Sequence, residues 1–385
     1  MNKRGFFLAL MVLGCGNKQW QVQNFSNEIQ YLRKISNDEQ EFYALASEKD
    51  KNGHIKDEEN NKDIDVKNND IKDNINIENK QLSSNNWMAR VDGSKKLNLL
   101  NIPGSHDSLA YNISDVVKRY AQCQNYTLKE QLENGIRIFD IRLFYDKENN
   151  DIFCCHGKGV FQCNCHQKGS DKLISYDLVL STIANFLKDH PTETVIIAPK
   201  HESGNKKSTN RHIDLEHKKL KEFGIIYTAN RVPSLNEVRG KIVLWDKKNA
   251  LQGGMKILTT DEHFSSGKYA GVCWKIQKKF KTTPDEKVRI LKRFLYNAKT
   301  SQDVDHGYIN YTSGFASFVA LPDSSSVAKS VNNLIKNYEF QKGYLYGWLI
   351  GDFVDVNYAK AIYMSNFIYF FLRTRGVTFM EVMAI

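Results

Sequence analysis

Short apolar runs alternate with longer amphipathic segments from about residue 87 onward. The short runs, rich in β-branched and aromatic residues, predict strands, and the amphipathic segments predict helices. Strands alternating with helices favour a parallel α/β sheet. We expect strands at 96–102, 136–144, 151–155, 194–199, 241–246, 271–276, 307–312 and 345–353, and helices that begin at Ser175, after Pro284, at Ser325 and after Asn357.

The number of strands narrows the fold class. Eight candidates in roughly 300 residues favour a closed (β/α)8 barrel over an open doubly wound sheet. A dinucleotide-binding fold lacks support, because no G-x-G-x-x-G follows the first strand. The chain has 385 residues, 41% of them hydrophobic, which suffices for a core of this size.

The N-terminal part predicts export and anchoring. Residues 1–14 place two basic residues before an apolar stretch that is too short to span a bilayer, as in a signal peptide. The ending Val12-Leu13-Gly14-Cys15 resembles a bacterial lipobox, with Cys15 as the lipidated residue. A plain signal peptide with a chance cysteine is the alternative. We expect a protein anchored to the bacterial membrane or surface.

A polar segment follows the expected anchor. Residues 15–86 are mostly Lys, Asp, Glu and Asn, and we expect a flexible tether because little apolar area is available to offset the cost of ordering. The expected barrel then spans residues 87–385. The net charge of +10 suits an anionic membrane surface, although a soluble lysine-rich surface explains it equally well. No nucleic-acid-binding motif is present, and we expect a monomer.

The carboxyl ends of barrel strands are where functional side chains gather. Two histidines, several basic groups and carboxylates follow the predicted strands, and together they suit a phosphate site. These residues are His106, Asp107, Asp140, Arg142, His156, Lys200, His201, Glu202, Asp246, Lys247 and Asp352.

Asp140 and Arg142 are two positions apart on one strand, so both point to the same side. The guanidinium offers a planar fork of donors to a phosphate, and Asp140 can hold it; a structural ion pair is the alternative. His106 and His156 are candidates for proton transfer. A Ser105-His106-Asp107 relay is disfavoured, because consecutive strand residues point to opposite faces.

Six cysteines lie beyond Cys15, and four of them fall within residues 154–165. In an exported protein we expect a disulfide inside this loop or from the loop to Cys123. Zinc is the weaker alternative, because the spacings are Cys-Cys and Cys-x-Cys rather than Cys-x-x-Cys.

Several motifs occur in the order found in one known family. IPGSHDS at 102–108 and QLENGIRIFDIR at 131–142 are the specific ones, and CHG at 155–157, ETVIIAPKHE, GKIVLWDKK and IGDF follow. Over residues 88–375 the chain resembles the bacterial phosphatidylinositol-specific phospholipase C family of the X-domain type. The resemblance implies a distorted barrel that cleaves phosphatidylinositol to diacylglycerol and inositol 1,2-cyclic phosphate.

The resemblance also implies roles for individual residues. His106 would accept the proton of the inositol 2-hydroxyl, with Asp352 orienting it. Arg142 would contact the phosphate, and His156 with Asp107 would protonate the leaving oxygen. Lys200 and Lys247 would bind ring hydroxyls. Calcium-dependent members carry an acidic residue at the position of Arg142, so no metal or other cofactor is expected.

The chain departs from the family pattern at two ring-binding positions. Lys278 and Phe280 stand where the family usually has Asp and Tyr, so an inositide with extra phosphates, or another phosphodiester, is expected to suit the site better. Phe315, Phe318 and Leu321 lie near the same rim and either enter a bilayer or pack in the core.

Two other functions stay open at this point. A glycerophosphodiester phosphodiesterase shares the barrel but needs a metal-binding Glu-x-Asp where this chain has Asp140-Ile141-Arg142. A lipoprotein that binds inositol head groups or host ligands without turnover would not need paired proton-transfer groups.

Overall fold

The computed structural model describes residues 82–113, 118, 121–157, 162–202, 206–251, 253–259, 263–301, 303–318, 321–374 and 377–384. The expected signal peptide, Cys15 and residues 15–81 of the expected tether lie outside these ranges. The first element is a 3-10 helix, η1 (Ser84–Arg90). In η1, Asn85 donates a hydrogen bond to Glu133 at 2.9 Å, so the folded part begins slightly before residue 87.

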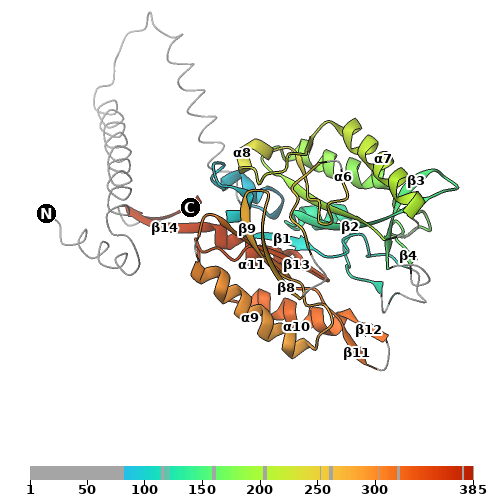
Figure 1. Cartoon of the computed structure of the whole chain (residues 1–385). Helices are drawn as coiled ribbons and strands as arrows, with labels where there is room; N and C mark the ends of the chain where they lie inside the picture. The colour runs from blue at the N-terminus through green and yellow to red at the C-terminus, as the bar shows by residue number, and fades with distance from the viewer. Residues whose placement is uncertain are drawn as a thin grey trace, which may run out of the picture. The chain divides into compact units, whose positions relative to one another are not determined.

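The main sheet is built from parallel strands in a curled arrangement (Figure 1). The parallel order is β6 (Ile226–Tyr227), β7 (Ile242–Leu244), β5 (Val195–His201), β2 (Ile138–Asp146), β1 (Ile102–Ser105), β13 (Trp348–Gly351), β10 (His306–Tyr311) and β9 (Val272–Gln277). The antiparallel strand β8 (Phe264–Tyr269) pairs with β9 at one edge.

The predicted α/β barrel is confirmed, but in a distorted form. The sheet curls without closing into a complete ring. The edge strands β6 and β8 do not pair with each other. With two residues, β6 offers few ladder hydrogen bonds across that edge. Near these two edges, the backbone N–H of Val232 donates a hydrogen bond to the carbonyl of Ala270 at 3.1 Å.

The strand expected at 96–102 is misplaced. Residues Leu97–Leu99 form a 3-10 helix, η2, and the strand β1 begins only at Ile102 and includes Pro103 and Gly104. A Cβ on Gly104 would lie 2.9 Å from Cβ of Ile138 and 3.0 Å from Cγ1 of Ile350. Glycine therefore lets β1 fit between β2 and β13.

The strand expected at 151–155 exists but lies off the barrel. β3 (Asp151–His156) turns back antiparallel to β2, and β4 (Cys163–Asn164) pairs with β3. An additional two-stranded sheet joins β11 (Ala316–Phe318) to β12 (Leu321–Asp323). The alternation of apolar positions predicts a strand, but it does not set its direction.

Three of the four predicted helices are confirmed as α6 (Tyr176–Asp189), α9 (Pro284–Ser301) and α10 (Ser324–Asn337). The side chain of Ser175 caps α6 by accepting from the backbone of Leu178. The other α-helices in the described ranges are α5 (Leu128–Glu133), α7 (Lys206–Phe223), α8 (Leu235–Val238) and α11 (Val356–Tyr363). Within the described ranges, no helix has the length and apolarity that crossing a bilayer requires.

The helix expected after Asn357, over residues 358–375, is confirmed only in its first part, and its continuation beyond residue 363 is wrong. α11 ends at Tyr363, the 3-10 helix η4 (Met364–Asn366) follows, and a hairpin of β14 (Phe367–Thr374) and β15 (Val377–Ala384) takes the rest. The segment FIYFFLRT is rich in aromatic and β-branched residues, which favour strands over helices.

Helices cover the outside of the curled sheet. In Figure 1, α6 and α7 lie on one side of it and α9 with α10 on the other. Inside, Trp348 of β13 packs against Trp245 and Trp274, with ring centroids 5.6 and 4.9 Å apart, and all three are fully buried. This cluster gives the sheet a dense interior and leaves the strand ends to carry polar groups.

The cysteines do not form the expected cross-link. Cys123, Cys154, Cys155, Cys165 and Cys273 are free thiols, so no disulfide joins any of these five. Burial raises the pKa of the Cys154 and Cys165 thiols well above the usual value. They are therefore neutral and pack as small apolar groups.

One fully buried lysine makes stability depend on pH. Lys287 donates to Gln277 at 3.3 Å, and burial lowers its pKa from 10.5 to about 7. Between these values the unfolded chain holds a proton that the folded chain lacks, so stability rises with pH across this window. We expect Lys287→Met to flatten that rise by up to about 1.4 kcal/mol per pH unit, measured by urea unfolding. An unchanged slope would contradict the assignment, and exposed Lys292→Met is the control.

Candidate active site

The ends of β1 and β13 bring a histidine and a carboxylate together. Nδ1 of His106 lies 2.8 Å from Oδ1 of Asp352, and the backbone N–H of His106 donates to the carbonyl of Gly351 at 2.8 Å. The buried side chain of Gln124 donates to the carbonyls of His106 and Gly351, at 2.7 and 3.0 Å. Gln124 therefore ties the two strand ends together and fixes the distance between His106 and Asp352.

Asp107 holds the second histidine. Its backbone has a φ of +40°, and its carboxylate lies 2.9 Å from Nε2 of His156 and 2.7 Å from Nε of Arg142. Burial works against the charged carboxylate, but Arg142 and the two histidines outweigh it and hold the pKa of Asp107 well below its usual value. Asp107 is therefore an anion that orients His156.

Arg142 is enclosed by three carboxylates. It pairs with Asp107, with Asp140 at 3.2 Å and with Glu202. Burial opposes its charge, yet these carboxylates raise the pKa of Arg142 well above its usual value. Its Nη2 also lies 3.4 Å from Nε2 of His106.

Glu202 has a structural role that the sequence did not indicate. It was recognised as a polar residue after a strand, but no role was assigned to it. It contacts both Arg142 and Lys200, the latter at 2.8 Å. The signal available was its register: Lys200 is the strand partner of Arg142, and Glu202 lies two residues further on.

Lys247 and Asp140 form a buried ion pair. Burial lowers the pKa of Lys247 to about 8, although Asp140 favours the charged form. Burial also opposes the charge of Asp140, but Arg142 and Lys247 hold its pKa below its usual value. The four carboxylates and the basic groups around them thus share one region at the strand ends.

Lys278 and Phe280, the two positions that depart from the family pattern, have different surroundings. Nζ of Lys278 lies 5.6 Å from the ring centre of Tyr311, whose ring also packs edge-on against His106 at 6.3 Å. Phe280 is 44% exposed and packs with His263 and Phe315 instead. Tyr311, which we did not single out from the sequence, is therefore the aromatic ring beside the histidine.

The predicted membrane-contact residues are only partly described. Phe315 is partly buried, and its ring centre lies 5.9 Å from that of Phe280. The side chains of Phe318 and Leu321 are not among those that the structure describes.

Ser105 donates to Ser108 at 2.8 Å and is buried. Ser105 is therefore part of the local turn, in agreement with the rejected serine relay.

The arrangement can move protons around an anion. Burial alone would lower the pKa of His106, but the carboxylates of Asp107 and Asp352 outweigh it and raise that pKa. Since a guanidinium cannot accept, the contact with Arg142 favours a lone pair on Nε2 of His106. The site therefore contains His106 as a possible base, the His156–Asp107 pair as a possible acid, and the guanidinium of Arg142 as a fixed positive charge. Groups of His, Cys and carboxylate in the same region could also hold a metal ion.

Comparisons with known proteins agree with this geometry. Residues 100–248 match the family described as phosphatidylinositol-specific phospholipase C, X domain. A Staphylococcus aureus 1-phosphatidylinositol phosphodiesterase is 27% identical over 70% of this chain and 88% of that protein. A Listeria monocytogenes protein of the same name is 35% identical over 42% of this chain and 49% of that protein.

Solved structures give the same result. A variant of the phosphatidylinositol-specific phospholipase C from S. aureus aligns with a TM-score of 0.63 and 26% identity, over 74% of this chain and 98% of that one. The L. monocytogenes enzyme aligns with a TM-score of 0.56 and 25% identity, over 74% and 99%. Fold and site together define an α/β-barrel protein of the phospholipase class. The family match over residues 100–248 and the similarity to these enzymes along most of their length support the bacterial phosphatidylinositol-specific phospholipase C family for this chain.

The contact between His106 and Asp352 gives a measurable prediction. We expect Asp352→Asn to lower the pKa of His106 by about one unit or more, because a nearby negative charge is lost. The pKa can be followed by NMR titration of the imidazole. Asp303→Asn, which removes the carboxylate 2.7 Å from His306, should leave the pKa of His106 unchanged. Equal values in both variants would show that Asp352 does not set it.

Proposed function

We propose that the protein is a phosphatidylinositol-specific phospholipase C that cleaves an inositol lipid to diacylglycerol and inositol 1,2-cyclic phosphate. The observation that carries this proposal is the pair of His–carboxylate contacts, His106–Asp352 and His156–Asp107, on either side of Arg142. A protein that only bound head groups would not need two such pairs.

In the proposed reaction His106 is the general base. Its Nδ1 is held by Asp352, which leaves Nε2 to accept the proton of the inositol 2-hydroxyl. The hydroxyl oxygen forms the new bond to phosphorus, and the bond from phosphorus to the diacylglycerol oxygen breaks. The His156–Asp107 pair gives that oxygen a proton, so protons balance over the step.

Arg142 supplies the positive charge. Its carboxylate partners hold the guanidinium in one orientation, which favours preorganised stabilisation of the phosphoryl oxygens. In this proposal, Asp140 holds both Arg142 and Lys247, and Lys200 and Lys247 face the inositol ring. No metal ion takes part in the proposed step.

The base assignment is tested with phosphatidylinositol vesicles. We expect His106→Ala to lower turnover by about 10²–10⁴-fold, the usual contribution of general base catalysis. His306→Ala is the matched control, since His306 lies at the opposite end of β10 from Tyr311. A chelator should leave wild-type turnover unchanged. Loss of turnover with chelator would favour a metal-dependent glycerophosphodiester phosphodiesterase instead.

We propose further that the preferred lipid carries an additional phosphate on the inositol ring. Lys278 has no carboxylate partner among the described residues, and burial together with the neighbouring cations Arg142, Lys248 and Lys200 lowers its pKa despite Asp140. The buried hydroxyl of Tyr311, beside Lys278, has no hydrogen-bond partner in the described part of the chain. An added phosphate would supply the charge and the acceptor that both groups lack.

A charge reversal tests this preference. We expect Lys278→Asp to lower turnover of phosphatidylinositol monophosphate relative to phosphatidylinositol by about tenfold or more, the value of one charge-assisted hydrogen bond. Lys275→Asp is the matched control, because Lys275 lies three residues before Lys278 and 5.6 Å from a tyrosine ring, that of Tyr308, but is exposed. Faster turnover of the unphosphorylated lipid by the wild type would refute the preference.

We propose that the rim around Phe280 and Phe315 faces the lipid surface. The exposure of Phe280 and its contact with Phe315 support an apolar patch beside the site. A lipid-anchored, exported protein acting as a monomer would agree with this, with Cys15 as the anchor and Phe318 and Leu321 extending the patch.

A further inference from the structure

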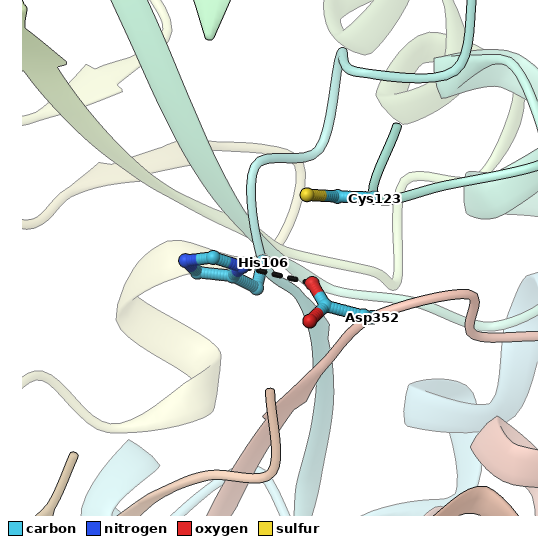
Figure 2. Close-up of side chains that lie close together, drawn as sticks. All are labelled: His106, Cys123 and Asp352. Carbon is cyan, nitrogen blue, oxygen red and sulfur yellow. Dashed lines mark hydrogen bonds and ion pairs between the residues drawn. The ribbon is translucent and has the colours of Figure 1, made fainter. Parts of the chain in front are cut away.

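A buried thiol lies next to both histidine–carboxylate pairs. Sγ of Cys123 is 4.0 Å from Oδ2 of Asp107, which in turn contacts His156. One ligand atom each from Cys123, His106 and Asp352 also lie within 4.8 Å of one another. Figure 2 shows the cysteine beside the hydrogen-bonded pair of His106 and Asp352.

The position of Cys123 is fixed by the backbone. Its N–H donates to Ala110 at 2.9 Å, and its carbonyl accepts from Phe353 at 2.6 Å, one residue after Asp352. The thiol therefore cannot move away from the strand ends without breaking the link to β13. The proposed phosphodiester reaction makes no use of it.

The chemistry of these three groups suits one class of ligand. An imidazole nitrogen, a thiolate and a carboxylate oxygen are the donors that zinc prefers, and three protein ligands leave a fourth position for water. Burial and the carboxylates of Asp352 and Asp107 raise the pKa of the Cys123 thiol, so it is neutral without a metal. The charge of a divalent cation would offset those carboxylates and stabilise the thiolate.

A second group of ligands shares the same thiol but suits a cation less well. Asp107, Cys123 and His156 also lie within 4.8 Å of one another. The carboxylate of Asp107, however, already pairs with Arg142 at 2.7 Å, whereas in the first group Arg142 approaches only Nε2 of His106, at 3.4 Å, so its positive charge opposes a second cation more strongly at Asp107. Among the described residues, Asp352 forms an ion pair only with His106, so no basic side chain competes for its carboxylate. A divalent cation is therefore favoured at Cys123, His106 and Asp352, the group drawn in Figure 2.

We propose that Cys123, His106 and Asp352 form an inhibitory site for a thiophilic divalent cation of the zinc class. Binding releases the thiol proton to solvent, occupies the carboxylate of Asp352 and breaks its hydrogen bond to Nδ1 of His106, which the proposed reaction needs to keep Nε2 as the base. Metal binding and turnover therefore exclude each other. The inhibition rests on the proposed function, whereas the binding site does not.

Binding is measured directly on the full chain. We expect calorimetry with Zn²⁺, in buffers of different ionisation heat, to give one strong site and about one proton released per ion. With Co²⁺ we expect a thiolate-to-metal charge-transfer band. Cys123→Ser and Cys123→Ala should both lose the band and weaken Zn²⁺ binding by about a hundredfold, a typical loss for a missing ligand or its support.

Two matched cysteine variants make the result specific. Cys273→Ser removes a partly buried thiol on β9, and Cys155→Ser removes a buried thiol on β3; both variants should bind Zn²⁺ as the wild type does. A band that persists in the Cys123 variants, or disappears in Cys155→Ser, overturns the proposal. Circular dichroism melts check that the variants are folded.

Turnover separates this site from the proposed function. We expect Zn²⁺ to inhibit the wild type and the Cys273 variant, and to inhibit Cys123→Ser about a hundredfold less. Inhibition that is equal in wild type and Cys123→Ser overturns the proposal. A protein that turns over no inositol lipid but keeps the Cys123-dependent band would contradict the proposed function and leave the metal site standing.

Discussion

The guanidinium of Arg142, held among Asp107, Asp140 and Glu202, is the interaction on which the site depends. A cation this deeply buried would be costly without partners, and three buried carboxylates would repel one another without it. Each carboxylate also holds a further group: His156, Lys247 and Lys200, respectively. A change at Arg142 therefore reaches every charged group around it.

The fold provides this arrangement through strand register. Arg142 and Lys200 are partners on β2 and β5, and Gly104 lets β1 lie close between β2 and β13. Gln124 then ties the ends of β1 and β13. The barrel can stay open between β6 and β8, because the site is built on the opposite, continuous part of the sheet.

Cys123 and Lys278 show how the same ends carry features that the reaction alone does not explain. Cys123 lies against the two histidine–carboxylate pairs, and Lys278 lies over Tyr311 without a carboxylate partner among the described residues. One suits a soft divalent cation and the other an anion, so the two features affect different properties of one site.

The sequence by itself determined the strand–helix alternation, the helices α6, α9 and α10 and the family motifs around His106 and Arg142, because periodicity and local caps are encoded over short stretches. It did not determine where β1 begins, the hairpin direction of β3, the end of α11 or the free thiols. Those depend on which strands meet and how closely, as the contacts of Gly104 show. The partners of Glu202 and Tyr311 likewise became clear only when the tertiary structure brought distant strand ends together, since a side chain's partners are set by packing rather than by its neighbours in sequence.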